Sequence, residues 1–109
     1  MPTGRLGTAN ITSTANTTIY TVPSSTFSVV SVSVCNRNST TAATIRVALA
    51  TSASPGLDEW IEYDTSLVAS GVVERTGLVM KASEVLVVQV SSATPTVSVV
   101  AMGIETSTA

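Results

Sequence analysis

The segment SVVSVSVCN, from Ser28 to Asn36, alternates valine with small polar residues over most of its length. A period of two places Val30, Val32 and Val34 on one face of a strand and the small polar side chains on the other. The segment TIRVALA, residues 44–50, repeats this pattern, and β-branched residues are abundant throughout. Helical spacing is hard to find, so the sequence predicts a chain of β-strands.

Clusters of Pro, Gly, Asn, Ser and Thr interrupt the alternation at short intervals and are typical of turns. They delimit about eight expected strands, at residues 18–22, 26–36, 42–51, 58–63, 72–75, 78–81, 84–91 and 96–104. Many short strands at this spacing favour a sandwich or a barrel. We therefore expect an all-β fold with no significant helix: a single antiparallel β-sandwich that is jelly-roll-like.

The two ends of the chain differ from these strands. Residues 1–15, MPTGRLGTANITSTA, hold few large apolar residues and many small polar ones. They predict either a frayed terminus or an arm that orders on a neighbouring subunit. A chain of 109 residues is expected to form one domain. We expect an N-terminal arm at 1–15, the β-sandwich at 16–105 and a C-terminal tail at 106–109.

Two segments near the C-terminus have apolar residues at more positions than one buried sheet face requires. EVLVVQV, residues 84–90, has apolar side chains at both parities, as a strand does when it lies between its own core and a partner. In TVSVVAMGIE, residues 96–105, the apolar positions change parity part-way. That change predicts a bulge, or a strand that is apolar on both faces.

Composition excludes several classes of function. Only 11% of residues are charged, the formal net charge is −2, and the five basic residues form no stripe, so we expect no nucleic-acid partner. The apolar runs are far shorter than the roughly 20 residues of a spanning helix, so no membrane partner is expected. The first residues lack the apolar core of a signal peptide, which predicts synthesis and folding in a cytosol.

The sequence also lacks the usual residues of catalysis. It contains no His and a single Cys, Cys35, so neither a His-based triad nor a Cys/His zinc site can form within one chain. The six Gly residues match no phosphate-binding fingerprint. We expect a buried, inert thiol at Cys35, no cofactor, no metal and no enzymatic activity. Two carboxylates, Asp58 and Glu62, keep a glycosidase as an unfavoured alternative.

The acidic stretch LDEWIEYD, residues 57–64, holds the only Trp of the chain. Strict alternation would put Leu57, Glu59, Ile61 and Tyr63 on the core face and Asp58, Trp60, Glu62 and Asp64 on the outer face. Trp and Tyr are enriched where binding energy concentrates, which makes an outward Trp a candidate interface anchor. A Trp that covers the core at an edge of the sandwich is the alternative. The candidate interface residues are Trp60, Asp58, Glu62 and, on the doubly apolar strand, Leu86.

Several segments resemble small structural proteins in the virions of tailed bacteriophages, particularly marine and cyanobacterial ones. The resemblance covers the chain from about Leu6 to Glu105. It rests on strand and turn patterns: YTVP (20–23), VCN (34–36), IRVALA (45–50), YDTSL (63–67), GLVMKASEVLVV (77–88) and GIE (103–105).

The resemblance implies a non-enzymatic β-sandwich located in the virion. A capsid decoration or cement protein is the leading expectation, with a neck, tail or fibre protein as the alternative. Its partners would be the major capsid protein or other virion proteins, and copies of itself in a homo-oligomer, for which a trimer is expected. A carbohydrate-binding or host-surface-binding module is the alternative of another class, although alternation would separate Trp60 from Tyr63 and so divide a stacking platform.

Overall fold

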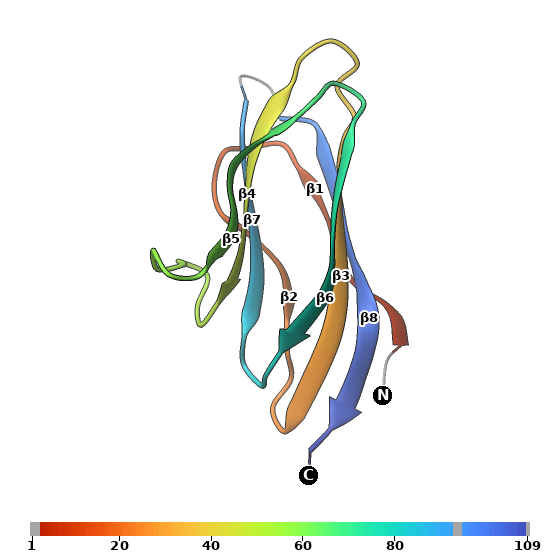
Figure 1. Ribbon diagram of the computed structural model, residues 1–109, viewed down its shortest axis with the longest axis vertical. Coiled ribbons are helices and arrows are strands. Elements are labelled where there is room, and N and C mark those ends of the chain that lie inside the picture. The colour runs from red at the N-terminus through yellow and green to blue at the C-terminus, as the bar shows by residue number, and fades with distance from the viewer. Residues whose placement is uncertain (1–2, 93–94, 109) are drawn as a thin grey trace.

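The computed structural model describes residues 3–92 and 95–108, and all the regular secondary structure in these ranges is strand (Figure 1). The strands are β1 (Thr3–Ile11), β2 (Thr17–Thr21), β3 (Thr26–Asn36), β4 (Ala43–Ala50), β5 (Trp60–Leu67), β6 (Val72–Met80), β7 (Val85–Ser91) and β8 (Val97–Ser107). The all-β prediction is confirmed. In the part of the chain that the structure describes, no helix is long and apolar enough to cross a membrane.

The strands form two antiparallel sheets with the order β1-β8-β3-β6, here called sheet A, and β2-β7-β4-β5, here called sheet B. Strand pairing is nested, because β1 pairs with β8, β2 with β7, β3 with β6, and β4 with β5. The chain is therefore one long hairpin that has been rolled up, with the β4–β5 connection at its tip. The further pairs β3–β8 and β4–β7 join these pairs into sheets. This is the strand order of a jelly roll, as predicted.

The core lies between the sheets and follows the alternation of the sequence. Val30, Val32 and Val34 of β3 are at most 1% exposed, and Ile45 and Val47 of β4 are fully buried. Burying a valine, leucine or isoleucine side chain stabilises a fold by about 1.5–3 kcal/mol, so these inward rows hold the two sheets together.

The N-terminal segment is a strand of the sandwich, which corrects the expectation of an arm at 1–15. Residues 3–11 pair with β8 along the edge of sheet A, and β8 extends to Ser107, into the predicted tail at 106–109. Close to this edge, a Cβ built on Gly7 would lie 2.2 Å from the carbonyl oxygen of Ile19. The absence of a side chain at Gly7 thus lets β1 pass directly beside β2. Residues 1, 2 and 109 lie outside the described residues.

Strand β6 is continuous, whereas the sequence predicted two strands separated by a turn at Thr76-Gly77. The register with β3 shifts between Val30 and Val32, where Gly77 adopts a φ of 69°. A β-bulge absorbs the extra residue, and glycine tolerates the left-handed conformation that the bulge requires. Thr76-Gly77 therefore does form a backbone irregularity, but it is a bulge within β6 and not a turn between two strands.

A buried polar cluster lies inside the sandwich. The Tyr20 hydroxyl donates to Oε2 of Glu105 and lies 2.7 Å from Oγ of Ser28. All three residues are at most 8% exposed. Burial, reinforced by the hydrogen bond to Glu105, raises the pKa of Tyr20 to about 12. The cluster fixes β2 to β3 and β8, and therefore one sheet to the other.

Candidate interaction surfaces

The acidic stretch departs from strict alternation because β5 contains a bulge. Strand β5 begins only at Trp60, and its register with β4 shifts twice, between Ile45 and Val47 and again before Ala48. Two residues, Tyr63 and Asp64, lie opposite the single residue Arg46, and Asp64 adopts a φ of 56°. Bulges of this kind change the direction in which side chains point.

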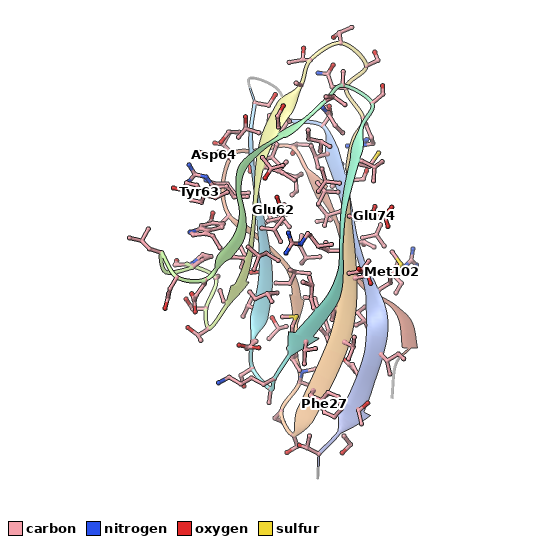
Figure 2. The ribbon with its side chains drawn as sticks, viewed as in Figure 1. Phe27, Glu62, Tyr63, Asp64, Glu74 and Met102 are labelled. Carbon is pink, nitrogen blue, oxygen red and sulfur yellow. The ribbon has the colours of Figure 1, made fainter. Side chains whose placement is uncertain are left out.

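Tyr63 consequently lies on the outer face of sheet B rather than in the core, which corrects the predicted division of faces. Its side chain is 54% exposed, and its ring centroid lies 5.8 Å from that of Trp60 in an edge-to-face arrangement. Figure 2 shows Tyr63 and Asp64 on the same outer side of β5. Leu57, also expected in the core, is 93% exposed. Of the four predicted core residues of the stretch, Ile61 does pack against the core.

Trp60 covers the outer face of sheet B. It packs against a small cluster of buried residues that point away from the main core: Ala48, Ala50, Val85 and Val87. The doubly apolar strand β7 therefore has its outer valines covered by a residue of the same chain, and it needs no partner for this purpose. Leu86, proposed as an interface residue, is fully buried in the main core and contributes nothing to the surface.

Arg46 completes a compact outer cluster with the two aromatic rings. Its guanidinium carbon lies 4.0 Å from the Tyr63 ring centroid, and its Nε donates to Oδ1 of Asp64 at 2.6 Å. That hydrogen bond holds the pKa of the Asp64 carboxyl below its ordinary value. Gln89 lies beside Arg46 and donates to the carbonyl of Thr14 at 3.1 Å, which secures the β1–β2 connection. We call Arg46, Trp60, Tyr63 and Asp64 the sheet B cluster.

Glu62 lies away from this cluster. It pairs with Val47, whose side chain faces the core, so Glu62 also points between the sheets. Oε1 of Glu62 accepts from Thr65 at 2.6 Å, and Oε2 accepts from Arg75 of β6 at 2.5 Å. The hydrogen bond from Thr65, followed by the Arg75 contact, lowers the pKa of Glu62 despite its partial burial. The ion pair joins the edges of the two sheets, which is a structural role in place of the predicted outward one.

Asp58 is exposed in the β4–β5 connection, outside any strand. The connection is organised by the neighbouring Glu59, whose carboxylate accepts from the backbone N–H of Gly56 at 2.8 Å and of Thr51 at 3.1 Å. Asp58 and Glu62 therefore do not lie on one strand face. The strand geometry that suggested a catalytic carboxylate pair is absent.

The outer face of sheet A carries an apolar patch that the sequence analysis did not single out. Its members, here called the sheet A patch, are Phe27 (39% exposed), Val29 (40%), Val79 (68%), Met102 (38%) and Ile104 (55%). Register places Val29 directly between Val79 on β6 and Ile104 on β8. Figure 2 shows Met102 on the side of the sandwich opposite Tyr63. The two outer surfaces are therefore separate.

The signal for this patch was present in the sequence as the second parity of β8. Register between β3 and β8 is unbroken from Thr26 to Asn36, so no bulge reverses β8. Val97 and Val99 face the core, whereas Met102 and Ile104 face outward. Of the two predicted explanations, a strand that is apolar on both faces is the correct one. Cys35, expected to be buried, lies on this outer face and is partly exposed.

Within residues 3–92 and 95–108, no pocket is found, and no three His, Cys, Asp or Glu side chains come together in a way that could hold a metal ion. The candidate interaction surfaces of the described residues are thus the sheet B cluster and the sheet A patch. Comparisons with protein-family models, with curated proteins and with solved structures gave no match.

Proposed function

We propose that this protein is a non-enzymatic structural protein of a tailed-phage virion, which decorates or cements the capsid shell. The observation that carries the proposal is the sheet B cluster, in which Trp60, Tyr63 and Arg46 meet on one outer face. These are the three residue types that dominate binding energy in protein interfaces. The major capsid protein is the proposed partner.

Fold and composition support the same proposal. The jelly roll is an architecture of viral capsid and lectin domains, which is an argument by analogy of fold. Only 11% of the residues are charged, so little electrostatic desolvation opposes packing against a protein lattice. The segments that resemble phage virion proteins span both sheets. A neck, tail or fibre location is the alternative within this class.

The test is binding to capsids of the same phage that lack the protein. The wild-type chain should bind saturably, and Tyr63→Ala should bind at least about tenfold more weakly, because a half-exposed aromatic anchor is removed. Val68→Thr is the matched control, since Val68 is 63% exposed but lies outside both surfaces. Absence of saturable binding by the wild-type chain would contradict the decoration role.

A second candidate, a carbohydrate-binding or host-surface-binding module, is favoured by one specific observation. The bulge in β5 brings the rings of Trp60 and Tyr63 to 5.8 Å, so the expected separation of the two aromatics does not apply. Arg46 covers one face of the Tyr63 ring, which leaves less of the ring for a sugar to stack on. A glycan array distinguishes the two candidates: Tyr63-dependent glycan binding would support this one, and a blank array with capsid binding would reject it.

A further inference from the structure

The sheet A patch is an apolar surface that crosses the two central strands of the four-stranded sheet A and reaches its edge strand β6. Val29 and Ile104 are cross-strand neighbours on the two central strands, and Val79 continues the same row onto the edge strand β6. These three side chains are 40%, 55% and 68% exposed. Contiguous exposed apolar surface at the centre of a sheet is costly in water and marks a site of protein contact.

The same face carries two charges at its opposite edges. Arg5 on β1 pairs in register with the outward Met102, and Glu74 on β6 pairs with Ser33. Both are exposed, and neither side chain has a hydrogen bond or ion pair to another described residue. The strands between them put the two side chains about 15 Å apart, since neighbouring strands lie about 4.8 Å from each other. They cannot pair within one chain.

A second copy of the chain satisfies both features at once. Consider a two-fold axis that runs parallel to the strands, midway between β3 and β8, with two copies of sheet A packed face to face. The axis places β1 of each copy over β6 of the other and β3 over β8. Val29 then meets Ile104 of the other copy, and Ile104 meets its Val29. Aligned sheets pack in this way about 10 Å apart.

The charges also become complementary under this axis. Arg5 of one copy lies over β6 of the other, at a level two residues along the strand from Glu74. With sheets about 10 Å apart, the offset of about 7 Å along the strand puts the two backbones about 12 Å apart, which the extended Arg and Glu side chains span together. The contact occurs twice, once at each edge of the interface. A sheet with a positive and a negative charge at opposite edges is therefore complementary to itself.

The area of the sheet A face is compatible with a second copy of the chain as its partner. Four strands span about 19 Å, and nine residues of strand span about 30 Å, so the face covers on the order of 550 Å² in projection. Stable interfaces bury about 600–1,000 Å² of accessible surface on each partner. The whole face must therefore be covered, and an identical sheet has the matching outline.

We propose that the outer face of sheet A is the interface of a two-fold homodimer, with Val29 and Ile104 at its centre and an Arg5–Glu74 ion pair at each edge. The proposed dimer replaces the trimer that the resemblance implied. It is independent of the virion role, because it concerns the isolated chain. It leaves the sheet B cluster, on the opposite side of the sandwich, exposed on both copies.

Analytical ultracentrifugation over a range of protein concentrations tests the proposal. The wild-type chain should sediment as a concentration-dependent dimer. Val29→Thr/Ile104→Thr keeps β-branched side chains on the strands but removes apolar contact twice per interface, and should raise the dimer Kd by at least about a hundredfold. Val68→Thr should leave the Kd unchanged. Circular dichroism at the same concentrations verifies that each variant is folded.

Charge reversal tests the geometry separately. Arg5→Glu and Glu74→Arg should each raise the dimer Kd about three- to tenfold, and combining them in one chain should restore it, because each new pair forms between copies. Reversal of exposed charges does not threaten the fold. A wild-type monomer at every concentration, a trimer, or a double reversal weaker than either single one would overturn the proposal.

Discussion

The buried cluster of Tyr20, Ser28 and Glu105 gives a quantitative prediction for Tyr20→Phe. The substitution keeps the ring but leaves the buried Glu105 without its phenol donor. Hydrogen bonds to charged groups contribute about 1.5–3 kcal/mol, so the free energy of unfolding at pH 7 should fall by about 2 kcal/mol. Urea denaturation followed by circular dichroism measures it. Tyr63→Phe, on an exposed residue, is the control and should change stability little.

The pH dependence of the free energy of unfolding provides a second, independent estimate of what Tyr20 contributes. The pKa of Tyr20 rises from 10.0 to about 12 on folding, chiefly through burial. Because the native pKa is the higher one, this stabilisation is complete below pH 10 and is lost as pH rises through 12. A difference of about two units corresponds to roughly 3 kcal/mol, of which about 2 kcal/mol should be lost between pH 9 and pH 12.

The assay is urea denaturation at several pH values from 7 to 12, with wild type and variant compared at each pH so that general alkaline effects cancel. The wild-type protein should lose its advantage over Tyr20→Phe as the pH rises toward 12. The reasoning is refuted if the two proteins differ by less than about 0.5 kcal/mol at pH 7, which is the range of neutral surface substitutions. Parallel stability curves up to pH 12 would refute it equally.

Three further substitutions test other contacts. Trp60→Ala should lower the free energy of unfolding by about 2 kcal/mol, because it exposes the outer valines of β7; thermal denaturation would show no change if Trp60 were only an interface anchor. Glu62→Gln should lower the free energy of unfolding by about 1 kcal/mol at pH 7. The wild type should also lose stability as the pH falls through the lowered pKa of Glu62, and the variant should not. Equal acid sensitivity in both proteins would contradict the stabilising role of the Glu62 carboxylate. Asn36→Ala should cost about 2 kcal/mol, because the Asn36 amide donates to the carbonyls of Thr41, Leu67 and Val68; an unchanged urea midpoint would exclude that role.

The fold was predictable from the sequence because most strands obey simple alternation. Val30, Val32 and Val34 face the core as their parity requires, and the spacing of turns located six of the strands, β2 to β5, β7 and β8. The predicted total of eight agrees with the structure only because β6 was divided into two strands while β1 was missed. The strand at residues 3–11 was not predictable from apolar content. It is rich in small and polar residues, and it is held by its edge pairing with β8 and by the close approach of Gly7 to β2.

The side-chain directions in the acidic stretch were not predictable, because they depend on an irregularity that composition does not reveal. The register of β5 shifts at Tyr63 and Asp64, where Asp64 occupies a left-handed conformation, and again between Glu62 and Trp60. Between the two shifts Tyr63 lies on the outer face and Glu62 turns toward Arg75, whereas Trp60 and Ile61 keep their predicted faces. A period-two count has no means of detecting inserted residues. The interpretation of Trp60 was incomplete for another reason, since one side chain can cover the valines of β7 and still present a surface.

If the protein has the proposed capsid role, the most direct test is its copy number in purified virions of the phage that would encode it. Quantitative mass spectrometry, calibrated against the major capsid protein, supplies this number. A decoration or cement protein should be present in hundreds of copies, in a fixed ratio to the shell subunits. A few to a few tens of copies would place the protein in the neck, tail or fibre, and its absence from the virion would contradict the structural role altogether.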